Sequence, residues 1–277
     1  MTSVSGDLVN VVNKASADLA TATLTISPGQ DVVWNASANA TDDAQVTVAI
    51  HAHLAKEYVR TFAPSMPTLD AAITTNVNIN QTCNASFDGK DLNFYRSSTQ
   101  CENTGRIADV VYHEFGHAMH FNSLIPGVGR MDGAFSEGLS DFLAVSITED
   151  PGMGRGFFFN DEALRHMDPA GREPRWPDDS GEIHKTGIIF GSAMWDLRKD
   201  FITRMVPVAY DPNAPRDTWT QFLERIFTRP GNNGQPTTAL IDYVHRLCGY
   251  AITGDPRERV LPILWGGGRN GKTTLLE

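Results

Sequence analysis

The sequence has no long apolar run, no excess of positive charge and few cysteines, and each absence narrows what the protein can be. No apolar stretch approaches the roughly 18 residues that a membrane-spanning helix requires, so we expect no membrane partner. The 277 residues carry a formal net charge of −10, and residues 208–277 are close to neutral. Because an acidic surface repels phosphate groups, we expect no nucleic-acid binding by residues 1–205.

The beginning of the chain also lacks the basic start and the apolar segment of a signal peptide. If the protein is exported, its signal is therefore not in this sequence. There are three cysteines, and two of them, Cys83 and Cys101, flank a polar segment that they could close into a loop. With Cys248 far away, the count suggests one disulfide and one free thiol. The alternative is three unpaired thiols in a reducing compartment.

What is present is a globular composition, with 41% hydrophobic and 20% charged residues. Patterning predicts an α+β fold, with a β-rich lobe over 1–104 and a helical lobe over 105–205. In the first lobe we expect a helix from Asp43 to about Phe62 and a hairpin turn at Asp88-Gly89. The strands expected there are 8–12, 22–26, 74–80, 84–87 and 92–95. The helices expected in the second lobe are 107–121, 134–147 and 185–202, with a long irregular stretch over 152–181.

The character of the sequence changes near Met205. Residues 206–215 contain three prolines and suggest an extended linker. Two helical segments, 218–227 and 238–251, precede an apolar strand over 260–265 and a glycine-rich turn. We therefore predict two domains, 1–205 and 206–277.

One pentapeptide indicates the chemistry: His113-Glu114-Phe115-Gly116-His117, inside the helix predicted over 107–121. Residues four apart lie on the same face of a helix, so both imidazole rings can reach one metal ion. Glu114 lies beside the first histidine, where it could hold and deprotonate a water molecule. The alternative is a helix whose histidines are ordinary core or surface residues.

A catalytic zinc needs a third protein ligand and an open position for water. Glu137, 20 residues after His117 on the next predicted helix, is the best candidate. Asp141 lies one turn further on the same face and can accept a hydrogen bond from a ligand histidine. An acidic, solvated helix face is the alternative for both carboxylates. His120 lies near the ligand face, but we expect it to be structural.

Three segments together resemble the gluzincin metallopeptidases, in particular the thermolysin-like and fungalysin-like families. They are His113-Glu114-x-x-His117, Gly133-Ala134 and Glu137-x-x-x-Asp141. In those families the glutamate beside the first histidine is the general base, the later glutamate is the third zinc ligand, and the aspartate orients a ligand histidine. The resemblance covers about residues 40–204. It implies a secreted or periplasmic zinc-dependent endopeptidase that acts on peptides or proteins, with a mixed β-sheet, an active-site helix and a mainly helical second lobe.

Two shorter segments extend the resemblance. Asn84-Ala85-x-Phe87-Asp88-Gly89 resembles the edge strand that pairs with the substrate backbone, which implies that Asn84 and Ala85 bind substrate. Gly181-Glu182-Ile183-His184 resembles the segment whose histidine stabilises the oxyanion. The alternative for His184 is a surface histidine in a loop.

The sequence departs from the family pattern in one place and follows it only in part in another. No tyrosine occurs between His117 and Glu137, and Val128 occupies the aligned position. Stabilisation of the transition state would then depend more on His184, or the activity would be weaker. Asp109 matches a calcium ligand of thermolysin-like enzymes, although the nearby acidic residues, Glu149 and Asp150, do not align cleanly. Calcium is therefore a secondary expectation.

The end of the chain carries a different motif. Gly266-Gly267-Gly268-Arg269-Asn270-Gly271-Lys272-Thr273 fits the P-loop pattern and follows an apolar strand. In a P-loop, backbone amides and Lys272 hold phosphates and Thr273 binds magnesium, so Gly266 and Gly271 would shape an ATP/Mg²⁺ site. Residues 210–277 resemble the start of a viral or plasmid-type primase-helicase ATPase. Because the chain ends soon after Thr273, we interpret 206–277 as a truncated P-loop fragment.

Three functions are consistent with these patterns. The first is a zinc-dependent endopeptidase with Glu114 as general base. The second is an ATP-binding fragment of a replicative primase-helicase, and the third is an inactive, zinc-binding gluzincin-like module. The sequence gives no indication of the oligomeric state.

Overall fold

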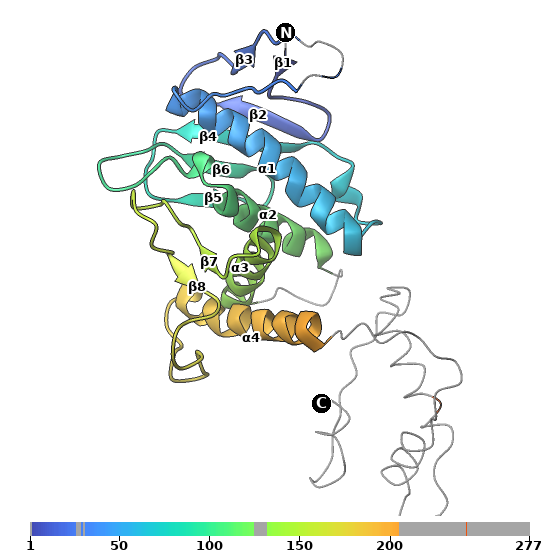
Figure 1. Cartoon of the computed structure of the whole chain (residues 1–277), viewed down its shortest axis with the longest axis vertical. Helices are drawn as coiled ribbons and strands as arrows, with labels where there is room; N and C mark the ends of the chain where they lie inside the picture. Colours follow the sequence, from blue (N-terminus) through green and yellow to red (C-terminus); the bar gives the residue numbers. More distant parts are fainter. Residues whose placement is uncertain (1, 26–28, 30, 125–131, 205–241, 243–277) are drawn as a thin grey trace, which may run out of the picture. The chain divides into compact units, whose positions relative to one another are not determined.

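The computed structural model describes residues 2–25, 29, 31–124, 132–204 and 242. These residues form an α+β arrangement in which a mixed sheet is followed by a group of helices (Figure 1). Contacts divide the chain into Met1–Val206 and Pro207–Glu277, and the elements below belong to the first unit. Apart from residue 242, the segments predicted over 206–277 lie outside the described residues. The same holds for Val128 and for the P-loop residues Gly266, Gly271, Lys272 and Thr273.

The main sheet has four strands in the order β2-β4-β6-β5. Their bounds are β2 Val9–Asn13, β4 Ile73–Ile79, β6 Leu92–Tyr95 and β5 Ala85–Phe87. Strands β2, β4 and β6 are parallel neighbours, and β5 pairs antiparallel with β6. Strand β5 therefore ends the sheet with one edge that no other described strand covers. These four strands confirm the predicted ones to within about one residue.

The turn between β5 and β6 forms for a local reason. The Asp88 carboxylate accepts the backbone N–H groups of Lys90 and Asp91, at 3.0 and 2.8 Å. Gly89 has a φ of 96°, a region that L side chains rarely adopt. The Asp88-Gly89 turn predicted from the sequence is thus confirmed.

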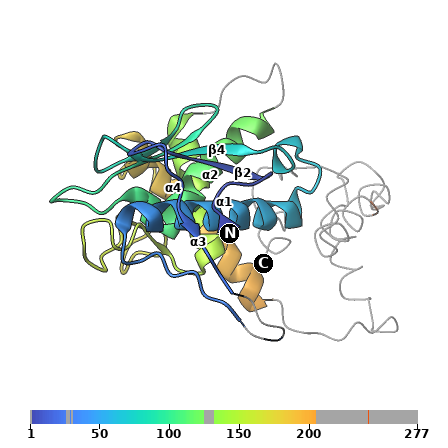
Figure 2. The same cartoon turned by 90° about the horizontal axis from the view of Figure 1, so that it is seen from above.

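The first helix, α1 (Ala40–Phe62), runs along the sheet and contacts β2 and β4 (Figures 1 and 2). Its apolar face buries Val48, Ala52 and Val59 in the core. The helix begins earlier than the predicted Asp43, because the Asn39 side chain caps it by accepting the N–H groups of Thr41 and Asp42. The helix propensities of the residues did not indicate this capping interaction.

Three helices complete the unit: α2 (Ala108–Ser123), α3 (Gly133–Thr148) and α4 (Ile183–Arg204). They confirm the predicted helices with shifts of one or two residues. Helix α2 contacts β5 and β6 as well as α3, and α3 also contacts α4 (Figure 1). None of the helices in the described part of the chain is long and apolar enough to cross a membrane.

Glycines allow the three helices to approach closely. A Cβ on Gly116 would lie 2.7 Å from the Cα of Ser140, and a Cβ on Gly138 would lie 2.2 Å from the carbonyl oxygen of Gly187. Both separations are shorter than real Cβ contacts, so larger residues would force the backbones apart. The helix that carries the two histidines can therefore lie against the helix that carries Glu137.

Two expectations about the strands were wrong. Of the strand predicted over 22–26, the described residues 23–25 are not in a strand, and β3 (Thr21–Ala22) pairs with β1 (Thr2–Ser3). The stretch 152–181 is not wholly irregular, since β7 (Gly152–Met153) pairs antiparallel with β8 (Arg165–His166). Two 3₁₀ turns, η1 Pro67–Leu69 and η2 Thr104–Arg106, complete the elements.

Cys83 and Cys101 form a disulfide, with Cα atoms 5.4 Å apart and a sequence separation of 18. Cys83 precedes β5, and Cys101 is fully buried ahead of η2. The predicted pairing is confirmed. The bond closes a loop that contains the β5–β6 hairpin, which is the edge of the sheet nearest to α2.

Replacing both cysteines by serine should lower the free energy of unfolding by about 3 kcal/mol, because the unfolded chain regains the entropy of an open loop. Urea denaturation of wild type and the double variant measures the difference. As a control, a reducing agent should destabilise the wild type and leave the double variant unchanged. Equal stability of the two proteins under oxidising conditions would contradict the prediction.

Candidate metal centre

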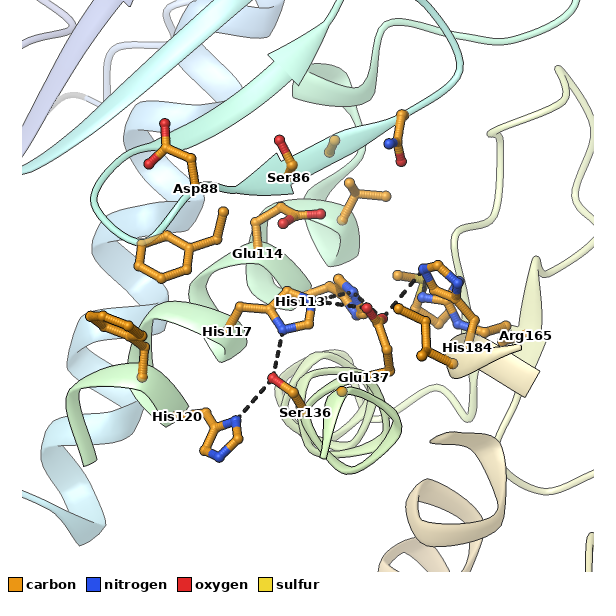
Figure 3. Close-up of a pocket in the computed structure, with 18 of the residues that line it drawn as sticks. Ser86, Asp88, His113, Glu114, His117, His120, Ser136, Glu137, Arg165 and His184 are labelled. Carbon is orange, nitrogen blue, oxygen red and sulfur yellow. Dashed lines mark hydrogen bonds and ion pairs between the residues drawn. The ribbon is translucent and has the colours of Figure 1, made fainter. Parts of the chain in front are cut away.

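Three side chains from two helices converge at the floor of a cleft: His113 and His117 from α2, and Glu137 from α3 (Figure 3). Their ligand atoms all lie within 4.8 Å of one another. The Nε2 atom of His113 is 3.1 Å from Nε2 of His117 and 3.2 Å from Oε2 of Glu137. Two imidazole nitrogens and a carboxylate are a donor set that suits a divalent transition metal. The structure thus brings together the three ligands predicted from the sequence.

Behind His113 lies an ion pair that fixes its ring. The Nδ1 atom of His113 is 2.7 Å from Asp141 Oδ1, and Arg165 donates two hydrogen bonds to the same carboxylate, at 2.6 and 2.7 Å. Burial raises the pKa of Asp141, but the charges of His113 and Arg165 outweigh it and hold that pKa well below its usual range. Asp141 therefore stays ionised and keeps Nε2 of His113 directed at Glu137.

Arg165 was not predicted. It lies in β8, within the stretch interpreted as irregular, and 24 residues separate it from Asp141. The repeat of a helix or a strand does not predict a contact between two residues that far apart in the sequence. The need for a cationic partner follows from the burial of Asp141, which only the structure shows.

His117 is held by a hydroxyl group instead of a carboxylate. Its Nδ1 atom is 2.9 Å from Ser136 Oγ, and the same oxygen is 2.9 Å from Nδ1 of His120 (Figure 3). Ser136 was also not predicted, and the only signal for it is that it directly precedes Glu137. His120 is buried and does not belong to the metal-ligand group, in line with the expectation that it is structural.

When no metal is bound, the two histidines differ in their affinity for a proton. Burial opposes a charge on His113, but the Asp141 carboxylate raises the pKa of His113 to about 9. Burial, followed by the charge of His113, lowers the pKa of His117 to about 4. Since a metal ligand must be deprotonated, binding of a metal at this centre should release a proton.

Glu114 lies next to this group and is only 5% exposed. Its Oε2 atom is buried and accepts no hydrogen bond from any described residue. Burial raises the pKa of Glu114 to about 7. A buried carboxylate with a free oxygen and a pKa near neutrality is suited to accept a proton from a small molecule beside it.

The cleft above these residues has a volume of about 800 Å³. Asn84, the residues of β5 and the turn residue Asp88 line one wall, and Figure 3 shows Ser86 and Asp88 across from His117 and Glu137. Because β5 is the edge of the sheet, this wall presents backbone groups as well as side chains.

His184 lines the other side of the cleft. It lies in the first turn of α4, which begins two residues before the helix predicted over 185–202. Its Nε2 atom is 3.5 Å from Glu137 Oε2, and its Nδ1 is 2.8 Å from Glu182 Oε2. The side chain is 44% exposed, so it can meet a molecule that enters the cleft.

Among the described residues, Asp109, Glu149 and Asp150, which suggested calcium, are not grouped as possible metal ligands. Asp109 accepts a hydrogen bond from the backbone N–H of Gly154, at 2.7 Å. Asp150 pairs with Arg155, whereas Glu149 lies 3.6 Å from Arg198. Each of these carboxylates therefore has a separate partner.

Comparisons with known proteins give little that bears on this centre. No protein-family model matches the chain, and no curated protein matches its sequence. Solved structures that it is similar to include the precursor of protealysin, a metalloproteinase from Serratia proteamaculans. That similarity covers 69% of this chain and 68% of the other, with 16% sequence identity and a TM-score of 0.47. Proposals about function therefore depend on the residues of the cleft.

Proposed function

We propose that residues 1–205 are a zinc-dependent endopeptidase. The observation that carries this proposal is the joint placement of a His-His-Glu donor set and the buried, unpartnered Glu114 at the floor of a cleft with an edge strand as its wall. The donors fit zinc, which commonly takes three nitrogen or oxygen ligands in hydrolytic enzymes. His113, His117 and Glu137 would hold the ion, which when bound would polarise a carbonyl group and lower the pKa of a water molecule.

Glu114 is the general base in this proposal. Its free Oε2 atom can take a proton from the attacking water and pass it to the amine that leaves when the peptide bond breaks. His184, on the opposite side of the floor, can donate a hydrogen bond to the carbonyl oxygen as that oxygen becomes negative. The fully buried Asp141 and its partner Arg165 keep His113 in place.

The substrate class follows from the wall of the cleft. An extended peptide can add to the free edge of β5 by backbone hydrogen bonds, with Asn84 and Ala85 beside the scissile bond. Backbone pairing recognises any extended polypeptide, so we propose peptides or proteins as substrates. The disulfide is stable in oxidising surroundings, which fits a secreted or periplasmic enzyme.

The full chain should contain about one zinc ion per molecule and should hydrolyse casein. A zinc chelator should abolish the hydrolysis, and added zinc should restore it, because water is activated by the bound ion in this proposal. Metal content is measured by elemental analysis and hydrolysis by peptide release. Zinc without cleavage of varied peptides would favour an inactive zinc-binding module, and absence of zinc would contradict both functions.

A further inference from the structure

Ser136 holds two histidines at once, and only one of them belongs to the metal-ligand group. Its Oγ atom lies 2.9 Å from Nδ1 of His117 and 2.9 Å from Nδ1 of His120 (Figure 3). His120 lies in the last turn of α2, is 8% exposed, and has an edge-to-face ring contact with Phe135. The three side chains thus form a chain of two hydrogen bonds inside the protein.

The number of hydrogens decides the direction of both bonds. When a neutral histidine offers Nε2 to a metal, its hydrogen is on Nδ1. His117 must therefore donate from Nδ1, and Ser136 Oγ must accept. The serine hydroxyl has one hydrogen of its own, and Nδ1 of His120 lies at hydrogen-bonding distance to receive it.

We propose that His120 is a positioning residue of the metal centre: by accepting the Ser136 hydroxyl hydrogen, it leaves Ser136 able only to accept from His117, which keeps Nε2 of His117 free for the metal. This inference depends on the metal site of the proposed function, and not on peptide hydrolysis.

The contrast with His113 shows why a third group is needed. Behind His113 stands Asp141, an ionised carboxylate that can only accept a hydrogen bond. A hydroxyl can accept or donate, so Ser136 alone would also tolerate the other tautomer of His117. In that tautomer Nε2 carries the hydrogen and cannot bind a metal. His120 with no hydrogen on Nδ1 accepts the hydroxyl hydrogen, and Ser136 can then only accept from His117.

Zinc affinity, measured on the full chain by competition with a chromophoric chelator, tests the role of the acceptor. His120→Leu should weaken zinc binding about tenfold, the lower end of what partners of ligand histidines contribute. His120→Asn should restore most of the affinity, because its side-chain oxygen stands where Nδ1 stood. His53→Leu, at an exposed position on α1, is the matched control and should bind zinc like the wild type.

A double-mutant cycle separates positioning from packing. Ser136→Ala should also weaken zinc binding, and His120→Leu should have no further effect once the hydroxyl is gone. Additive effects of the two substitutions would overturn the proposal, because they would mean that His120 acts without Ser136.

A spectroscopic measurement on the zinc-loaded wild type does not depend on any variant folding. Long-range ¹H–¹⁵N correlations should show His117 with its hydrogen on Nδ1 and His120 with its hydrogen on Nε2. A hydrogen on Nδ1 of His120 would overturn the proposal.

Zinc binding and the tautomers are measured without a substrate. A chain that binds zinc and has these tautomers but cleaves no peptide would therefore contradict the peptidase function alone. A chain that binds no zinc would contradict both.

Discussion

Replacing Glu114 by glutamine should lower kcat/KM for peptide hydrolysis by about 10³-fold or more while the zinc content stays unchanged, since general bases contribute about 10²–10⁴-fold. Glutamine has the shape of glutamate but cannot accept a proton. Because Glu114 is absent from the metal-ligand group, the substitution leaves His113, His117 and Glu137 in place. Casein hydrolysis and elemental analysis on the same preparation measure the two quantities.

The loss should be specific to this carboxylate. Glu57→Gln, at an exposed position on α1, provides the matched control and should retain wild-type activity. If Glu114→Gln kept its activity within tenfold of wild type, Glu114 would not be the general base. Loss of zinc together with activity would show that Glu114 supports the metal site instead.

The second large effect is expected for Asp141→Ala, which should lower the free energy of unfolding by about 3–5 kcal/mol. Asp141 is fully buried, and its removal would leave the mostly buried Arg165 guanidinium without a counter-charge. It would also free the ring of His113, so zinc affinity should fall by about 10–100-fold. Urea denaturation and chelator competition measure the two losses.

Two companion variants test the cause. Asp70→Ala breaks an ion pair with Arg60, but the Asp70 side chain is 78% exposed. The free energy of unfolding of this variant should therefore stay close to that of the wild type. Adding Arg165→Met to Asp141→Ala removes the uncompensated charge and should recover part of the stability. Zinc affinity should stay low in that double variant, because His113 still lacks a partner. Recovery of both properties would contradict the role given to Asp141.

The pH dependence of the same effect follows from the lowered pKa of Asp141. A carboxyl group whose pKa is lower in the folded state stabilises that state above its unfolded pKa, and the contribution is lost as the pH falls toward the folded pKa. The stability difference between wild type and Asp141→Ala should therefore be full at pH 7. It should narrow below about pH 4, near the ordinary pKa of aspartate.

Much of the local structure could be predicted because it depends on neighbours in the sequence. The Asp88-Gly89 turn forms from its own hydrogen bonds and from a glycine with positive φ. The helix around His113 and His117 follows from its own residues, and helical geometry alone places the two rings on one face. The error at Asn39 also has a local cause, a side-chain cap, whereas the extent of β3 depends on its pairing with the distant strand β1.

The sequence by itself determined the α+β class and a helix able to offer two imidazoles to a metal. It also proposed the disulfide between Cys83 and Cys101, with unpaired thiols as the alternative. The tertiary structure decided how the site is completed. Glu137 reaches the histidines because Gly116 lets α3 lie against α2, and Arg165 reaches Asp141 from a separate strand pair. The hydrogen bonds of a helix determine the relative positions only of residues a few places apart in the sequence. The distances between helices and strands depend on how side chains pack across the whole core. The partners of the ligand histidines therefore became visible only in three dimensions.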